Sequence, residues 1–247
     1  MTAEARAALV SADEVLCVVS DPVALQALQR LNRSTRSLHT LYEPGRLRME
    51  TYRAMVEEIL RAVRRGGKIC VALYGHPGVF AWPTHESIRR AREEGLSARM
   101  LPAVSAEDCL FADLGVDPGA RGCQSYEATD FLLRRTMIDT SAVLILWQIA
   151  VVGNAAHAPD GDSSRLPILA ERLSVLYSAA HEVVLYEASP FPGCDPLVQR
   201  LPVAEIAKAD LSPATTLYVP PLETRRADPE MKARLGMTGG SGASRNS

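Results

Sequence analysis

The sequence predicts an α/β protein in which the pattern of strands and helices changes near residue 122. In the first half, short apolar, β-branched runs alternate with helical patterns at short intervals. Alternation at this density is typical of parallel strands joined by right-handed crossovers. The chain has 247 residues and a hydrophobic content of 47%, which is enough to bury a large core.

In the first half, each expected element follows from a local pattern. The run DEVLCVVS is apolar and ends at an Asp-Pro pair, and the long helix places apolar residues at spacings of three and four before two glycines. Ser105 has a carboxylate three residues later, a capping-box-like helix start. The expected elements are strand 13–20, helix 23–31, helix 46–65, strand 68–74, helix 85–94, strand 97–104 and helix 105–115. We expect residues 1–120 to form an N-terminal α/β subdomain.

The second half, residues 121–222, is expected to form a C-terminal α/β subdomain. Its most apolar run, SAVLILWQIAVV, has twelve residues and is too short to cross a bilayer, so a buried strand is expected. The expected elements are a short strand and helix within 122–133, strand 141–152, a plain surface loop at 154–165, helix 166–180, strand 182–189 and strand 215–221. Residues 223–247 are polar and predict a flexible tail with some helix around 229–235.

Composition excludes several classes of function. The net charge is −2 and the pI is about 6.2, so no basic field attracts nucleic acid. The five cysteines form no CxxC pair and the histidines lack ligand spacing, so neither a disulfide framework nor a metal site is expected. No signal peptide or membrane-spanning run is found, which predicts a cytoplasmic protein that does not contact membrane. The expected partner is a small molecule or a peptide.

The loop YGHPGVF, residues 74–80, follows an expected strand and leads into a helix. In open α/β sheets ligands bind outside the carboxyl ends of strands, and glycines there let backbone N–H groups approach a ligand. The simpler interpretation is a βα turn whose glycines merely permit positive φ. A dinucleotide site is disfavoured, because no GxGxxG follows the first strand.

A second cluster precedes and enters the long helix. Arg48 and Tyr52 lie one helical turn apart on one face, and Tyr42 precedes them. A guanidinium beside a phenol favours the phenolate, which can accept a proton that bulk solvent would not remove. The structural alternative is that Tyr52 is a core aromatic residue with Arg48 extended over it.

Seven stretches of the chain occur in the order found in the tetrapyrrole methylase-like family: VVSDPVA, YEPGRLRMETY, LYGHPGVF, MLPAVSAEDCLFADLGVDPG, GCQSYEATDFL, LWQIAVVGN and LYVPP. The sequence resembles this family over about residues 13–222, and its borosin branch most closely. The resemblance implies two α/β subdomains of the tetrapyrrole methylase type with a cofactor cleft between them. It also implies an S-adenosyl-L-methionine-dependent enzyme that N-methylates backbone amides of a ribosomally made peptide and releases S-adenosyl-L-homocysteine.

The resemblance assigns roles to individual positions. The cofactor-binding residues that it implies are Tyr74, His76, Val79, Phe80, Ser105, Ala106, Gln148, Ala188, Thr215 and Thr216. The catalytic and substrate-aligning residues that it implies are Tyr42, Arg48, Tyr52 and Tyr74. No metal is required. Two positions depart from the pattern, since His39 stands where a further tyrosine is expected and Ala103 where a glycine is expected.

An amide nitrogen is a poor nucleophile because its lone pair is delocalised into the carbonyl. We therefore expect Tyr52, as a phenolate, to take the N–H proton while Arg48 stabilises charge on the amide oxygen. Tyr42 is expected to hold the amide, and Tyr74 to align the methyl group for in-line transfer.

The resemblance also bears on partners. Single-chain borosins continue into a helical clasp domain and a methylated peptide, whereas the polar MTGGSGASRNS ends this sequence. We therefore expect a split system that acts in trans on a separate precursor, as a homodimer or as a heterotetramer with two precursor chains. Two alternatives stay open: methylation of a tetrapyrrole or other small molecule, and a non-catalytic protein that binds the cofactor or a peptide.

Overall fold

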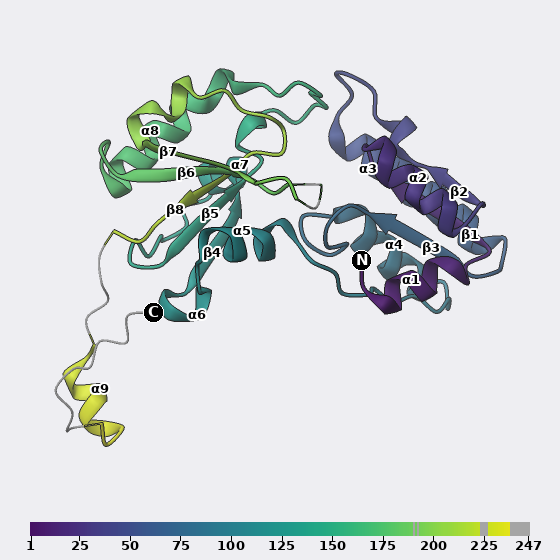
Figure 1. The fold of residues 1–247 in the computed structure, drawn as a ribbon, viewed down its shortest axis with the longest axis horizontal. Helices are drawn as coiled ribbons and strands as arrows, with labels where there is room; N and C mark the ends of the chain where they lie inside the picture. Colours follow the sequence, from purple (N-terminus) through teal and green to yellow (C-terminus); the bar gives the residue numbers. More distant parts are fainter. Residues whose placement is uncertain (190, 192, 223–226, 238–247) are drawn as a thin grey trace.

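Two β-sheets organise the chain, one in each of two lobes (Figure 1). The computed structural model describes residues 1–189, 191, 193–222 and 227–237. The first lobe holds strands β1 to β3 and the second holds β4 to β8. The predicted α/β fold class is confirmed. We keep the division at residues 120 and 121 as a proposal, and note that helix α5 packs against the sheet of the second lobe.

The helices and strands have the following bounds. The helices are α1 Ala3–Val10, α2 Pro22–Leu31, α3 Arg48–Arg64, α4 Trp82–Glu93, α5 Ala106–Leu114, α6 Pro118–Arg121, α7 Ala128–Leu133, α8 Leu166–Tyr177 and α9 Pro229–Arg234. The strands are β1 Glu14–Val18, β2 Thr35–Ser37, β3 Ile69–Leu73, β4 Cys123–Glu127, β5 Val143–Trp147, β6 Glu182–Glu187, β7 Leu197–Pro202 and β8 Thr216–Val219. Short 3-10 helices are η1 His39–Leu41, η2 Ile149–Val151, η3 Ser163–Arg165 and η4 Val203–Lys208.

The first sheet is entirely parallel, in the order β2-β1-β3, as the strand–helix alternation predicts. Helix α3 packs on it because its buried residues, among them Met55 and Ile59, recur at helical spacing and meet Leu16 of β1. The parallel register brings the carboxyl ends of β1 and β3 to the same edge. The loop that follows β3 therefore begins at an edge where ligands bind in such folds.

The first lobe departs from the expectations at three places. Helix α1 and the three-residue strand β2 were not predicted, because neither has a strong apolar period. The strand expected at 97–104 is wrong, since this segment has no regular structure. Pro102 removes one N–H donor from it, and the segment and β3 both line an apolar cavity of about 1160 Å³ instead of forming a strand pair.

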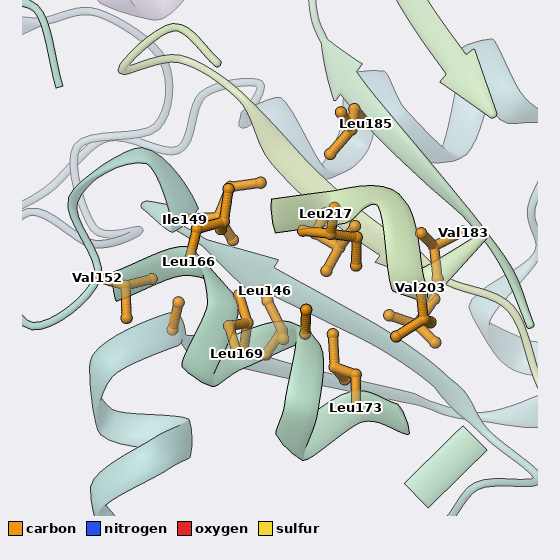
Figure 2. Packing of buried hydrophobic residues seen from close by; sticks show 14 of the residues in the cluster. Leu146, Ile149, Val152, Leu166, Leu169, Leu173, Val183, Leu185, Val203 and Leu217 are labelled. Carbon is orange, nitrogen blue, oxygen red and sulfur yellow. The ribbon is translucent and has the colours of Figure 1, made fainter. Parts of the chain in front are cut away.

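The second sheet is mixed, in the order β4-β5-β8-β6-β7, with β4 and β5 parallel and the other pairs antiparallel. All five residues of β5 are buried, because the sheet is covered on both faces. Leu146 faces the core formed with α8 and η4 (Figure 2). Ile145 packs on the opposite face, in the cluster that contains Leu110 of α5. The edge strand β7 is largely exposed, so no apolar pattern predicted it.

The strand expected at 141–152 is too long. It ends at Trp147, because Gln148 has a φ of 59° in the left-handed region, which breaks the ladder, and η2 follows. The expected helix near 229–235 is present as α9, while residues 223–226 and 238–247 of the expected tail lie outside the described residues. Among the described helices, none is both long and apolar enough to cross a membrane.

The packing of Leu146 predicts a large stability effect. Leu146→Ala should lower the free energy of unfolding by about 2–5 kcal/mol, because it leaves a cavity between tightly packed layers. Leu133→Ala, at a side chain that is 77% exposed, should change it by less than about 0.5 kcal/mol. Urea denaturation of both variants tests this, and equal losses would contradict the assignment of the core.

Candidate functional site

A cavity of about 410 Å³ lies between the two lobes. The first lobe contributes the start of α3, the loop after β3 and the start of α4, and the second contributes the ends of β4 and β5 and the loop after η2. Its lining residues are Arg48, Met49, Tyr52, Gly78, Phe80, Ala81, Trp82, His85, Glu127, Gln148 and Ala155. Four of the predicted site residues, Arg48, Tyr52, Phe80 and Gln148, therefore meet in one cavity.

Arg48 joins the lobes at this cavity. Its guanidinium donates to Gln148 Oε1 at 2.7 Å and to the backbone oxygen of Asn154 at 2.7 Å. Its own backbone N–H donates to Ala155 O at 2.9 Å, so the first residue of α3 is held by main chain and side chain together. Charge-assisted bonds of this kind are stronger than neutral ones. The loop at 154–165, predicted as a plain surface loop, thus forms part of the site.

The phenols of Tyr42, Tyr52 and Tyr74 influence one another. Burial raises the pKa of Tyr42 well above its ordinary value, the neighbouring phenols of Tyr52 and Tyr74 raise it further, and the charge of Arg48 lowers it only slightly. Tyr42 is hydrogen-bonded to Tyr52, and this bond also raises the pKa of Tyr42. These effects together favour the neutral form of the Tyr42 phenol.

The loop after β3 carries four of the predicted cofactor residues. Tyr74 is 75% exposed and lies outside the lining of the 410 Å³ cavity, as do His76 and Val79. The loop turns at Gly75, with a φ of 70°, and His76 Nδ1 accepts the N–H of Gly78 at 2.9 Å. Phe80 reaches the other lobe, where its ring lies 5.4 Å from that of Trp147. The loop therefore spans from the first sheet to the end of β5.

The start of α5 lies beside this loop. Ser105 and Asp108 form the capping box that the sequence predicts: Ser105 N–H and Oγ both donate to Asp108 Oδ2 at 2.6 Å, and Asp108 N–H donates to Ser105 Oγ at 3.1 Å. The bonds from Ser105 lower the pKa of Asp108, with a smaller contribution from nearby His76. Ser105 and the exposed Ala106 do not line the 410 Å³ cavity.

The remaining predicted cofactor residues lie on the second sheet, away from the cavity lining. Thr215 and Thr216 are buried, and Thr215 Oγ1 donates to Glu187 at the end of β6. Ala188 follows directly and packs on the core cluster that contains Trp147. Their roles toward a cofactor stay predictions.

Several lining residues were not singled out from the sequence. Met49 continues the apolar spacing of α3, but it is 39% exposed and lines the cavity. Trp82, which begins α4 before Pro83, could have been found from that helix-start signal. Glu127 caps α7, accepting from Thr129 Oγ1 at 2.9 Å and from Asp130 N–H at 2.8 Å. Within the described residues, no group of His, Cys, Asp and Glu is arranged to hold a metal ion.

Comparison with protein families gives one match that covers most of the chain. The sequence profile described as Tetrapyrrole (Corrin/Porphyrin) Methylases matches residues 1–189. Among solved structures, the uroporphyrin-III-C-methyltransferase of Thermus thermophilus superimposes with a TM-score of 0.63 at 19% identity, covering 90% of this chain and 88% of that one. This likeness supports the fold.

Curated relatives are more similar in sequence. A methyltransferase/ribosomally synthesized cyclic peptide precursor for gymnopeptides, from Gymnopus fusipes, is 40% identical and covers 91% of this chain and 55% of its own length. A type III borosin cyclic peptide precursor from Anomoporia bombycina is 38% identical and covers 96% of this chain and 28% of its own length. The chain therefore spans little more than half, or less, of these relatives.

The capping box at α5 predicts a pH-dependent stability difference. Asp108→Asn should lower the free energy of unfolding by about 1 kcal/mol at neutral pH, the size of a lost helix cap. Because the pKa of Asp108 is lowered in the folded state, its contribution to stability is complete above the ordinary carboxyl pKa of 3.8 and is lost as the pH falls through the lower folded pKa. Urea denaturation between pH 2 and 7 should show the two proteins converging in acid, and a constant difference would contradict the capping role.

Proposed function

Because the chain belongs to the tetrapyrrole (corrin/porphyrin) methylase family, we propose that it is an S-adenosyl-L-methionine-dependent methyltransferase that N-methylates backbone amides of a ribosomally made peptide. The observation that carries the proposal is the meeting of Arg48 and Tyr52 in the interlobe cavity, with Tyr42 bonded to Tyr52. The names of the curated relatives, which join a methyltransferase to a peptide precursor, support the peptide as substrate class.

The residues around the cavity suit a sulfonium cofactor. The cavity lies outside the carboxyl ends of β3 and β5, and the rings of Phe80 and Trp82 offer faces that attract a cation. Gln148 adds an amide that can bond to polar groups of the cofactor. When bound, S-adenosyl-L-methionine supplies a methyl group activated by the positive sulfur. We propose that the other predicted positions extend this site: Tyr74, His76, Val79, Ser105, Ala106, Ala188, Thr215 and Thr216.

The neighbouring phenols of Tyr42 and Tyr52 provide an acceptor for the amide proton. The raised pKa of Tyr42 keeps its phenol neutral, and we propose that it donates to the oxygen of Tyr52 when negative charge is present there. We propose that Tyr52, as a phenolate, accepts the amide proton and becomes a neutral phenol, and that Arg48 stabilises the charge that develops on the amide oxygen. Because Arg48 is held by Gln148 and Asn154, it needs no rearrangement during the reaction.

The proposal extends to the partner. We propose that the methylated peptide is a separate chain bound in trans, and that the enzyme works as a homodimer or as a heterotetramer with two precursor chains. The proposed location is the cytoplasm.

Removing the hydroxyl of Tyr52 tests the chemistry. Tyr52→Phe should lower kcat for methylation of the cognate precursor by roughly 100-fold or more, because the proton acceptor is lost. Arg48→Lys should also lower kcat, since an ammonium cannot make both bonds to Gln148 and Asn154 in the planar geometry of the guanidinium. Tandem mass spectrometry places each added methyl, and calorimetry measures cofactor affinity, which should persist in Tyr52→Phe.

Tyr126→Phe is the matched control, because Tyr126 packs on the core of the second lobe and lies outside the cavity lining. It should retain wild-type turnover. The proposal fails if Tyr52→Phe methylates as fast as the control, or if the methyl groups are found on side chains instead of backbone nitrogens.

The proposal that the methylated peptide is a separate chain makes its own prediction. When the 247-residue chain is incubated with S-adenosyl-L-methionine alone, its intact mass should stay unchanged, because the methylated amides belong to another chain. Adding the precursor should give methylated precursor and unmethylated enzyme. A mass increase on the enzyme by one or more methyl groups would show that it modifies itself.

A further inference from the structure

Tyr42 packs against the core of the first lobe, as Tyr52 does, but it lies in an irregular segment of the chain. It follows η1 and precedes Pro44 and Gly45, so no regular helix or strand carries it. Its backbone N–H makes one local bond, to His39 O at 3.0 Å. A phenol that must meet Tyr52 therefore needs to be held by groups from elsewhere in the chain.

That support comes from the second lobe. Residues 155–157 run antiparallel to residues 45–48, and we call the pair the interlobe strip. Its backbone bonds are Gly45 N–H to His157 O at 3.1 Å, His157 N–H to Arg46 O at 2.8 Å and Arg48 N–H to Ala155 O at 2.9 Å. The strip carries the imidazole of His157 to the ring of Tyr42.

Two imidazoles contact the Tyr42 ring. The ring centroids of His157 and Tyr42 are 4.7 Å apart with an interplanar angle of 36°, and those of His39 and Tyr42 are 5.2 Å apart at 64°. Both distances fall in the range of favourable aromatic pairs. His39 is on the same short segment as Tyr42, whereas His157 comes from the other lobe and fixes the ring relative to the cavity.

The strip is rigid on the side of the second lobe. Asn154 Nδ2 donates to Asp162 Oδ2 at 2.9 Å, and Ala156 N–H donates to Asn154 Oδ1 at 2.8 Å. The backbone N–H of Asp162 is bonded in turn to Ala150 O at 2.6 Å. The base of the loop is thus closed by both main-chain and side-chain bonds, so His157 is presented from a fixed support.

We propose that His157 is a positioning residue for methyl transfer, whose ring holds the Tyr42 phenol in the orientation that meets Tyr52. This inference rests on the proposed function and deepens it, because it makes the orientation of Tyr42 in the first lobe depend on a side chain of the second lobe. His157 makes its strip bonds through the backbone only, so replacing its side chain removes the ring contact and leaves the strip bonds in place.

The test compares His157→Ala with His157→Phe. His157→Ala should lower kcat roughly 10- to 100-fold with cofactor affinity unchanged, because a misplaced phenol costs rate. His157→Phe keeps a ring at this position and should restore most of the rate. Equal loss in both variants would overturn the stacking role, as would wild-type kcat in His157→Ala.

His181→Ala is the matched control. His181 also stacks on a tyrosine, with a ring distance of 5.2 Å to Tyr177, but neither residue lines the cavity. It should lower the melting temperature without changing kcat, which separates a general packing loss from the positioning of Tyr42.

A second readout does not depend on methyl transfer. In protein labelled with 3-fluorotyrosine, the ¹⁹F signal of Tyr42, identified by its loss in Tyr42→Phe, should move toward that of an exposed tyrosine in His157→Ala and stay shifted in His157→Phe. An unmoved signal in His157→Ala overturns the inference. An inactive wild type with the expected signal changes would instead count against the proposed function alone.

Discussion

The contact of Arg48 with Gln148 and Asn154 is the interaction on which the arrangement of the site depends. It joins the first residue of α3 to the end of β5 and to the loop after η2. The two lobes have separate sheets and separate cores, so contacts such as this one fix the position of one lobe relative to the other. Because Arg48 also lines the cavity, the group that joins the lobes brings a positive charge to it.

Strained backbone conformations occur beside this contact. Among the described residues, Phe80, Gln148 and Ser178 are the non-glycine residues with positive φ, and the first two line the cavity. Each left-handed residue of this kind costs of order 1–3 kcal/mol and persists only where its surroundings hold it. Gln148 is held by Arg48, and Phe80 by the ring of Trp147. The strained residues are thus the ones that bring the loop after β3 and the end of β5 to the same cavity.

Local patterns in the sequence were sufficient for the elements that carry the site. The apolar period of α3, the apolar run of β3 and the capping box of α5 all predict elements that the structure contains. The one-turn spacing of Arg48 and Tyr52 places both side chains in the cavity. By contrast, the segment at 97–104 is not paired with any strand in the described part of the chain, because pairing depends on tertiary placement that the local sequence pattern does not encode.

The contribution of Asn154 and His157 could not be predicted for a related reason. Their loop reads as polar and irregular, and it contacts a segment about a hundred residues earlier mainly through backbone atoms, which leave no side-chain pattern. Such contacts can be recognised only when the relative position of the two lobes is known. The same fact explains why the loop matters: its backbone bonds fix where Arg48 begins α3, and its one aromatic side chain lies against Tyr42. Because this loop fixes the position of the Arg48 guanidinium and contacts the ring of Tyr42, it constrains the geometry of the site more directly than the strands that precede it.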